Sequence, residues 1–145
     1  MNYHTLNLLF RCNKEFIHKR LRKQELSNTE YMICSYIYSY EYCSQDDVSV
    51  ALKIDKTTVG KALASLEKKN CIIRIPDAED KRIKRLSFTE KGRSKISEVI
   101  DLYDNWLKKI MTCLSEEEQK QFEKCCDKLL AEAVNLITNH EETNE

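Results

Sequence analysis

The fold of this chain is decided by residues 55–92, which read DKTTVGKALASLEKKNCIIRIPDAEDKRIKRLSFTEKG. Asp55 is a favourable N-cap, so a helix is predicted to begin directly after it. Apolar residues at helical spacing mark the inward side of this helix: Val59, Leu63 and Leu66. Asn70 stands where the helix should stop, because asparagine tolerates the left-handed conformation that the residue after a helix needs.

Two short strands follow this helix. Residues 71–75 and 83–88 show the β-branched content and the alternation of strands, and the loop at 76–82 carries proline and charge, as an exposed hairpin tip does. A short helix is predicted at 44–53, before the helix that begins at Asp55. Two such helices followed by a hairpin are the outline of a winged helix-turn-helix.

The rest of the chain is predicted to be helical, because it has only two glycines and one proline and its apolar residues recur every three or four positions. Capping boxes of the form S-x-x-E begin at Ser27 and Ser115. Beside the two helices above, helices are expected at 3–23, 27–42, 89–110 and 115–138. The fold class is therefore mainly α with a small β-hairpin wing.

The length of 145 residues suits a single domain, 1–145. Residues 27–92 would form the winged helix-turn-helix lobe. The helices of 1–25 and 93–138 each have an apolar face, and no other domain is present to cover it, so a two-fold homodimer is expected. In the last helix the predicted inward residues are Phe122, Cys125 or Cys126, Leu129, Ala133, Leu136 and Ile137.

Charge is distributed unevenly along the chain. The net charge is zero, yet residues 53–93 carry twelve basic and six acidic side chains, whereas 111–145 carry three and nine. The middle is thus locally about +6 and the tail about −6. A basic block of this kind favours a polyanionic partner.

The cysteines and histidines exclude several classes of protein. Seven cysteines form no C-x-x-C pair, and three scattered histidines offer no ligand spacing, so neither a metal site nor a cofactor is expected. A cysteine-dependent enzyme would need a recognisable Cys-His neighbourhood, which is missing. No signal peptide or apolar run of about 18 residues occurs, so no membrane association is expected. The chain fits a reducing, cytoplasmic location in which most thiols fill core space.

The helix after Asp55 has small polar and basic residues where a major-groove helix needs them. Such a helix enters the groove with its first turns, so side chains there must reach base edges without bulk. The candidates for DNA contact are Lys56, Thr57, Thr58, Gly60, Lys61 and Ser65. A solvated helix face is the alternative interpretation of these residues, and for Gly60 simple tolerance is the alternative to close approach to the groove. The neighbouring short helix and basic hairpin favour DNA.

The hairpin tip carries Asp80, Lys81 and Arg82. A carboxylate two residues before an arginine can hold the guanidinium in an orientation suited to a narrow minor groove. Lys81 and Lys84 are candidates for phosphate contact. Strand alternation means that Lys84 and Arg85 cannot both point the same way.

Three segments resemble the MarR family of bacterial transcription regulators. Asp80-x-Arg82, five residues and Phe88-Thr89 resemble its D-x-R-x(5)-L-T wing signature, with phenylalanine in the leucine position. The segments LSNTEY at 26–31 and LEKKNCI at 66–72 resemble its entry to the second helix and its L-E-[KR]-[KR]-G-[LY]-[IV] segment. The similarity covers nearly the whole chain, and the wing signature is its specific part.

This resemblance implies a homodimer whose terminal helices interlock and whose two recognition helices read a palindromic operator on double-stranded DNA. It also implies that Asp80 and Arg82 are the wing pair. The chain departs from the family at three positions, where Ser49 replaces an alanine and Lys53 and Asn70 replace glycines. A repressor is the expected function. A winged-helix module that binds protein partners without specific DNA binding is the alternative.

Two kinds of regulation are typical of such proteins. A small aromatic effector could lie between the lobe and the dimer helices, although tyrosines at helical spacing are more often core residues. Oxidation is the other, and the candidate redox residues are Cys113, Cys125 and Cys126.

Overall fold

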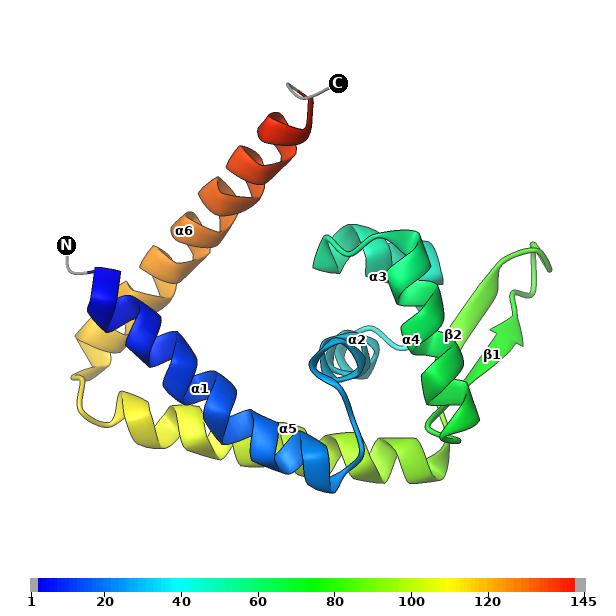
Figure 1. Ribbon diagram of the computed structural model, residues 1–145, viewed down its shortest axis with the longest axis horizontal. Coiled ribbons are helices and arrows are strands. Elements are labelled where there is room, and N and C mark those ends of the chain that lie inside the picture. Colours follow the sequence, from blue (N-terminus) through cyan, green and yellow to red (C-terminus); the bar gives the residue numbers. More distant parts are fainter. Residues whose placement is uncertain (1–2, 143–145) are drawn as a thin grey trace. The chain divides into compact units, whose positions relative to one another are not determined.

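The computed structural model describes the backbone of residues 3–142 and the side chains of residues 3–137. The elements follow one another in this order: α1 Tyr3–Lys23, α2 Asn28–Ser39, α3 Gln45–Leu52, α4 Lys56–Lys68, β1 Ile72–Pro76, β2 Lys84–Phe88, α5 Glu90–Met111 and α6 Glu116–Glu142 (Figure 1). This order confirms the predicted fold class. The chain divides into two compact units, Met1–Tyr103 and Asp104–Glu145, and α5 runs from one into the other.

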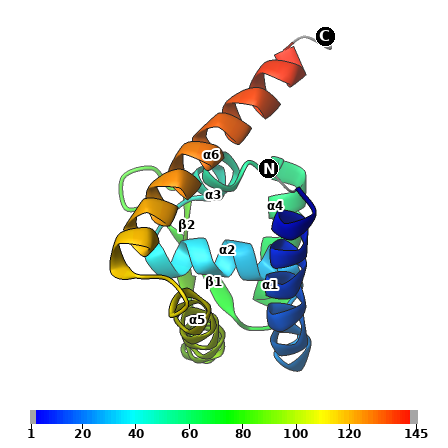
Figure 2. The same cartoon turned by 90° about the vertical axis from the view of Figure 1, so that its left-hand side faces the viewer.

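The first unit is built around α2. In Figure 1, α2 is seen end-on, with α1 on one side and with α4 and the hairpin on the other, and Figure 2 shows the same helix from its side. Its core is an apolar cluster to which every element of the unit contributes. The most deeply buried side chains include Leu21, Ile33, Ile37, Val48, Val59, Leu63, Leu66, Ile72, Leu86, Ile96 and Val99. This confirms the predicted inward side of α4.

Both capping boxes form as predicted. The Ser27 amide donates to the Glu30 carboxylate at 2.7 Å, and the Glu30 amide donates to the Ser27 hydroxyl at 3.1 Å. Ser115 and Glu118 repeat the arrangement at the start of α6. Each box satisfies two amides that a helix start otherwise leaves without partners, which fixes where these helices begin.

The second helix ends earlier than predicted, at Ser39 and not near Tyr42. Tyr42 takes a left-handed conformation with φ of 63°. Its amide donates to the carbonyl of Leu86 at 3.0 Å, and the Leu86 amide donates to the carbonyl of Cys43 at 2.8 Å. The end of α2 is thus determined by pairing with β2, a distant contact that helical propensity does not encode.

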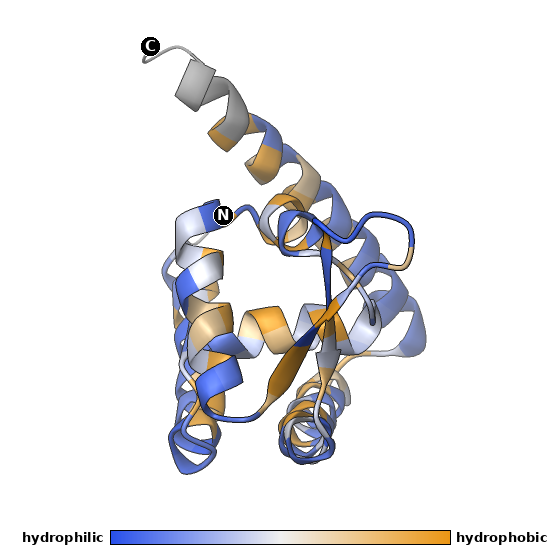
Figure 3. Ribbon diagram, turned by 90° about the vertical axis from the view of Figure 1, so that its right-hand side faces the viewer, coloured by the Kyte–Doolittle hydropathy of each residue, from blue (hydrophilic) through white to orange (hydrophobic). Residues whose placement is uncertain are grey.

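The hairpin is antiparallel, with Ile72 opposite Phe88 and Pro76 opposite Lys84. The prediction placed Pro76 in the loop, whereas the structure places it at the end of β1. Segment 42–44 flanks β2 on its other side, so β1 is an edge strand, where proline is tolerated. Figure 3 colours most of the connecting loop hydrophilic, as expected for an exposed tip.

In the second unit, the amide of Gln119 joins α6 to the end of α5. It donates to the carbonyls of Met111 and Leu114, both at 3.0 Å. Most of the residues predicted to face inward from α6 are exposed in this chain, among them Phe122, Leu129, Leu136 and Ile137. The periodicity therefore identified an apolar face correctly, but within the described residues that face is not covered.

The cysteines are less buried than predicted. Cys34, Cys43 and Cys71 lie in the core, whereas Cys12, Cys113, Cys125 and Cys126 are exposed, so the expectation that most thiols fill core space is wrong. Burial raises the pKa of Cys34 to about 12 and that of Cys43 to about 11. No described group of three His, Cys, Asp or Glu side chains could hold a metal ion. Among the described helices, none combines the length and apolarity needed to cross a bilayer.

Candidate nucleic-acid interface

The start of α4 is held by Asp55. Its carboxylate accepts the Thr58 amide at 2.8 Å and the Thr58 hydroxyl at 2.6 Å. These bonds lower the pKa of Asp55, with the Thr58 hydroxyl contributing most. Just before it, Lys53 turns the chain with φ of 54°, and the Ser49 hydroxyl donates to the Ile54 carbonyl at 2.6 Å. The first turn of α4 is therefore ordered without any ligand.

Four of the six candidate contact residues on α4 are exposed: Lys56, Thr57, Thr58 and Lys61. Lys56 pairs with Asp46 of α3 at 3.0 Å, and both side chains are 67% exposed. An ion pair so open to water contributes under about 1 kcal/mol. Lys56 can therefore leave Asp46 for a phosphate at little cost.

The other two candidates on α4 contact neighbouring protein elements. A Cβ at position 60 would lie 3.2 Å from Nε2 of Gln45, so Gly60 allows α3 to approach α4. The Gln45 side chain donates to the carbonyl of Lys56 at 3.1 Å and accepts from Arg74 at 3.3 Å. This gives Gly60 a packing role beside the predicted groove contact. Gln45, which links α3, α4 and β1, was not predicted from the sequence.

Ser65 belongs to a cluster around Glu30. The Lys69 ammonium donates to both carboxylate oxygens of Glu30 at 2.7 Å and to the carbonyl of Glu25 at 2.8 Å. Burial raises the pKa of Glu30, but hydrogen bonds from Lys69, Ser27 and Ser65 outweigh it and leave that pKa below its usual value. The cluster joins the end of α4 to the start of α2.

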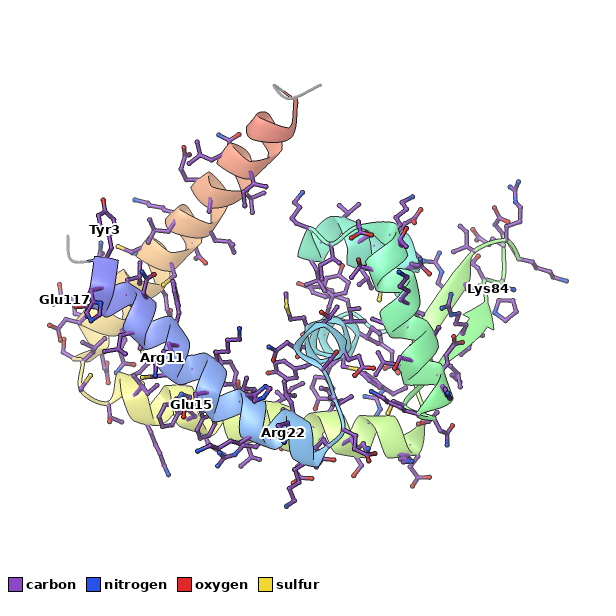
Figure 4. All side chains as sticks on the ribbon, viewed as in Figure 1. Tyr3, Arg11, Glu15, Arg22, Lys84 and Glu117 are labelled. Carbon is purple, nitrogen blue, oxygen red and sulfur yellow. The ribbon has the colours of Figure 1, made fainter. Side chains whose placement is uncertain are left out.

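The wing tip presents Arg82. Its Nε and Nη2 atoms donate to the two oxygens of Asp80, both at 3.0 Å, and the Arg82 side chain is 91% exposed. The Arg82 hydrogen bonds lower the pKa of Asp80, so the carboxylate stays ionised. Lys81 and Lys84 are exposed as well, and Figure 4 labels Lys84 on the hairpin. The structure thus gathers the candidate wing residues at one tip.

Arg85 differs from the exposed Lys84, because it is partly buried and paired with two acids. Its Nε donates to Asp77 at 2.6 Å, and its Nη1 lies 3.9 Å from Asp47. Sequence reasoning identified neither acid as a partner. The sequence did contain a signal for the role of Asp77. An aspartate in a loop commonly accepts the backbone amides two and three residues ahead, which here belong to Glu79 and Asp80.

A groove of about 350 Å³ separates the start of α3 from the hairpin. It is lined by Ser44, Gln45, Asp46, Arg74, Arg82, Ile83, Lys84 and Leu86. Three of these side chains are basic and one is acidic, so the groove is open and predominantly cationic. An extended anionic chain is the ligand that such a surface fits.

Comparison with known proteins relates the DNA-binding lobe predicted from the sequence to a family. The family model described as MarR family matches residues 26–84, which include α2 to α4 and most of the hairpin. These residues match the MarR family. This confirms the resemblance that the sequence motifs carried. The curated relatives of this chain are named as transcriptional regulators, in agreement with a regulator and not an enzyme.

Two curated relatives illustrate the similarity. The HTH-type transcriptional regulator BilQ of Clostridioides difficile is 27% identical over 129 residues, which are 86% of each chain. The transcriptional repressor MprA of Escherichia coli is 31% identical over 115 residues, 78% of this chain and 65% of MprA.

Solved structures share the fold. The Staphylococcus aureus MepR–DNA complex superimposes with a TM-score of 0.80 at 24% identity, covering 92% of this chain and 96% of MepR. A MarR transcriptional regulator from Methanosarcina mazei gives 0.77 at 19% identity, with the same coverage. These structures establish the winged-helix fold of this chain.

Proposed function

We propose that this chain is a sequence-specific transcription regulator that binds double-stranded DNA as a homodimer. One observation carries the proposal. An arginine almost fully open to solvent, Arg82, is oriented by two hydrogen bonds to Asp80 at the tip of a hairpin beside a helix that exposes Lys56, Thr57 and Lys61. In the proposed complex α4 enters the major groove and Arg82 enters the adjacent minor groove. MepR, which has been solved with DNA, shares this fold and supports the proposal.

The homodimer is inferred from uncovered apolar side chains. On α1, Tyr3, Leu8 and Phe10 are exposed, and on α6 the exposed residues include Leu129 and Leu130. Exposed apolar side chains gathered on a helix mark interaction sites, and we propose that a second copy of the chain covers them in a two-fold arrangement. We propose that the chain divides into a DNA-binding lobe, residues 27–92, and a dimerisation region formed by residues 1–25 and 93–138. Residues 1–2 and the side chain of residue 138 lie outside the described residues.

A two-fold dimer carries two copies of α4, so we propose a palindromic operator with half-sites one helical turn apart. Occupying an operator blocks transcription, and we propose a repressor in a cytoplasmic setting. The relative MprA is named a repressor.

Two forms of release are proposed. A cavity of about 250 Å³ lies beside Ile17, Tyr31, Met32 and Tyr103 in the first unit and has room for a single aromatic ring. Oxidation would act instead through the exposed thiols Cys113, Cys125 and Cys126. The two proposals are separated on a preformed protein–DNA complex. Aromatic acids should release the DNA if the cavity binds an effector. Peroxide should release it from the wild-type protein, but not from a variant with serine at the three thiols, if oxidation is the signal.

The test of DNA binding is selection of bound duplexes from a random pool, followed by measurement of the dissociation constant at several salt concentrations. Binding to the selected duplex should weaken steeply with salt, because each phosphate contact releases counterions. Arg82→Met should weaken binding about tenfold and lower the salt slope by about 1. Arg22→Met, which removes an exposed arginine from α1, is the control and should change little. Salt-independent retention, or no retention on any duplex, would favour the protein-interaction alternative.

The dimer is tested by light scattering during size-exclusion chromatography. Leu129→Glu combined with Leu130→Glu should convert a dimer to monomer, whereas Gln121→Glu at another exposed α6 position should not. A wild-type monomer at micromolar concentration would overturn the homodimer.

A further inference from the structure

The loop of the wing is organised from inside by Asp77. One oxygen of its carboxylate accepts the amides of Glu79 and Asp80, at 2.9 and 3.0 Å. The Asp77 amide in turn donates to the carbonyl of Ile83 at 3.0 Å. A side chain that accepts amides two and three residues ahead fixes the turn in one conformation. The backbone that carries Asp80 therefore depends on Asp77.

The second oxygen of Asp77 is held by Arg85. The Arg85 Nε donates to it at 2.6 Å, from the strand that follows the loop. Arg85 also faces Asp47, whose carboxylate accepts the amide of Ser44 at 2.7 Å and so caps α3. A continuous series of polar contacts thus leads from the start of α3 to the turn of the wing.

These residues differ from the tip in exposure. The Asp77 side chain is 16% exposed and that of Arg85 34%, whereas Arg82 is 91% exposed. Hydrogen bonds between charged groups are stronger and geometrically stricter where water is partly excluded. Asp77 and Arg85 are therefore suited to holding the wing and not to touching DNA.

We propose that Asp77 and Arg85 are positioning residues that fix the wing turn so that Asp80 can aim Arg82 at the minor groove. This inference rests on the proposed function for its effect on DNA affinity. The effect on wing geometry belongs to the free protein and can be measured without DNA.

The proposal makes a prediction whose sign opposes simple electrostatics. Asp77→Asn removes a negative charge from a DNA-binding surface, which by charge alone strengthens binding. The neutral amide oxygen of asparagine accepts the two loop amides more weakly than a carboxylate does, and it holds Arg85 only weakly. Positioning therefore predicts weaker binding despite the more favourable charge.

The matched control is Glu79→Gln. Glu79 lies in the same loop with an exposed side chain, and the substitution makes the same change in charge. Fluorescence anisotropy with the selected duplex should show Asp77→Asn about tenfold weaker than wild type and Glu79→Gln equal to wild type or tighter. Equal affinities for the two variants would overturn the proposal.

A second pair tests the arginine. Arg85→Met should weaken binding by a similar factor, beyond the loss caused by Arg93→Met, which removes another partly exposed guanidinium paired with an acid, Glu41. The double variant Asp77→Asn/Arg85→Met should bind no more weakly than either single variant, because both act through one contact. Fully additive losses would contradict a shared role.

The free-protein measurement is hydrogen exchange of the Glu79 and Asp80 amides, together with the NMR signal of the Arg82 Nε–H group. Asp77→Asn and Arg85→Met should speed exchange at both amides and shift the Arg82 signal toward that of an unpaired arginine, while thermal melting stays cooperative. Unchanged exchange and an unchanged Arg82 signal would refute positioning, whether or not DNA binds. A wild-type protein that binds no duplex refutes only the proposed function.

Discussion

The two glycines of this chain should respond in opposite ways to the same substitution, alanine. A Cβ at position 92 would lie 1.8 Å from the carbonyl oxygen of Cys71 and 2.5 Å from its carbonyl carbon, whereas ordinary contact begins at 3.4 Å. The same carbonyl accepts the Thr89 amide at 3.0 Å and the Thr89 hydroxyl at 3.2 Å. The start of α5 and residue 71, just before β1, must therefore separate by more than 1 Å to admit a methyl group.

The cost follows from what that separation disrupts. Forcing a methyl group into a packed interface costs about 1–3 kcal/mol. Weakening the hydrogen bonds to a buried carbonyl adds about 1–3 kcal/mol. The better helix propensity of alanine returns only about 1 kcal/mol. Gly92→Ala should therefore lower the free energy of unfolding by about 3 kcal/mol, a large part of the 5–15 kcal/mol of a typical domain.

Urea denaturation followed by circular dichroism, at fixed protein concentration because a dimer is expected, gives the free energy directly. Gly60→Ala is the comparison. Its new methyl group meets only the end of a flexible side chain, Gln45 at 3.2 Å, so stability should stay within about 1 kcal/mol of wild type. A Gly92→Ala protein as stable as wild type, or a Gly60→Ala protein equally destabilised, would refute this reasoning.

Three further predictions concern buried ionisable groups. Lys69→Met should lower the free energy of unfolding by about 2–3 kcal/mol, because Glu30 would keep a buried charge without its partner. In urea denaturation, the double variant Lys69→Met/Glu30→Gln should recover part of this loss. The pKa of Glu30 is lowered in the fold, so its contribution is present above its ordinary value of 4.5 and lost as pH falls through the folded pKa. Acid denaturation of Glu30→Gln should accordingly be less steep below pH 4.5 than that of wild type, and equal slopes would contradict this. Burial raises the pKa of Cys34 to about 12, so mass spectrometry after alkylation of the native protein should find Cys126 modified and Cys34 intact.

Local chemistry explains the parts of the fold that the sequence predicted. The Asp55 cap, the Ser27 and Ser115 capping boxes and the left-handed Asn70 depend on residues within a few positions of each other. Such features can be read from spacing alone. The end of α2 depends instead on Tyr42 reaching Leu86, a contact between distant segments.

The candidate site divides in the same way. Asp80 and Arg82, two residues apart, were predicted as a pair and form one. Gly60 meets Gln45, and Arg85 meets Asp77 across the hairpin, so these packing and ion-pair roles appear only when the elements are assembled in three dimensions. The apolar face of α6 was predicted correctly, but no pattern in a single sequence says which surface covers it.

The turns of the first unit have a consequence for engineering. Among the described residues, the backbone turns to positive φ at Glu25, Tyr42, Lys53 and Asn70, and none of these is glycine. An L-residue other than asparagine or aspartate carries about 1 kcal/mol of strain in that conformation. Replacing Lys53 by glycine should therefore remove backbone strain from the turn in front of α4. More thermostable variants can therefore be sought by substitutions at these turns, which leave both the core and the cationic surface unchanged.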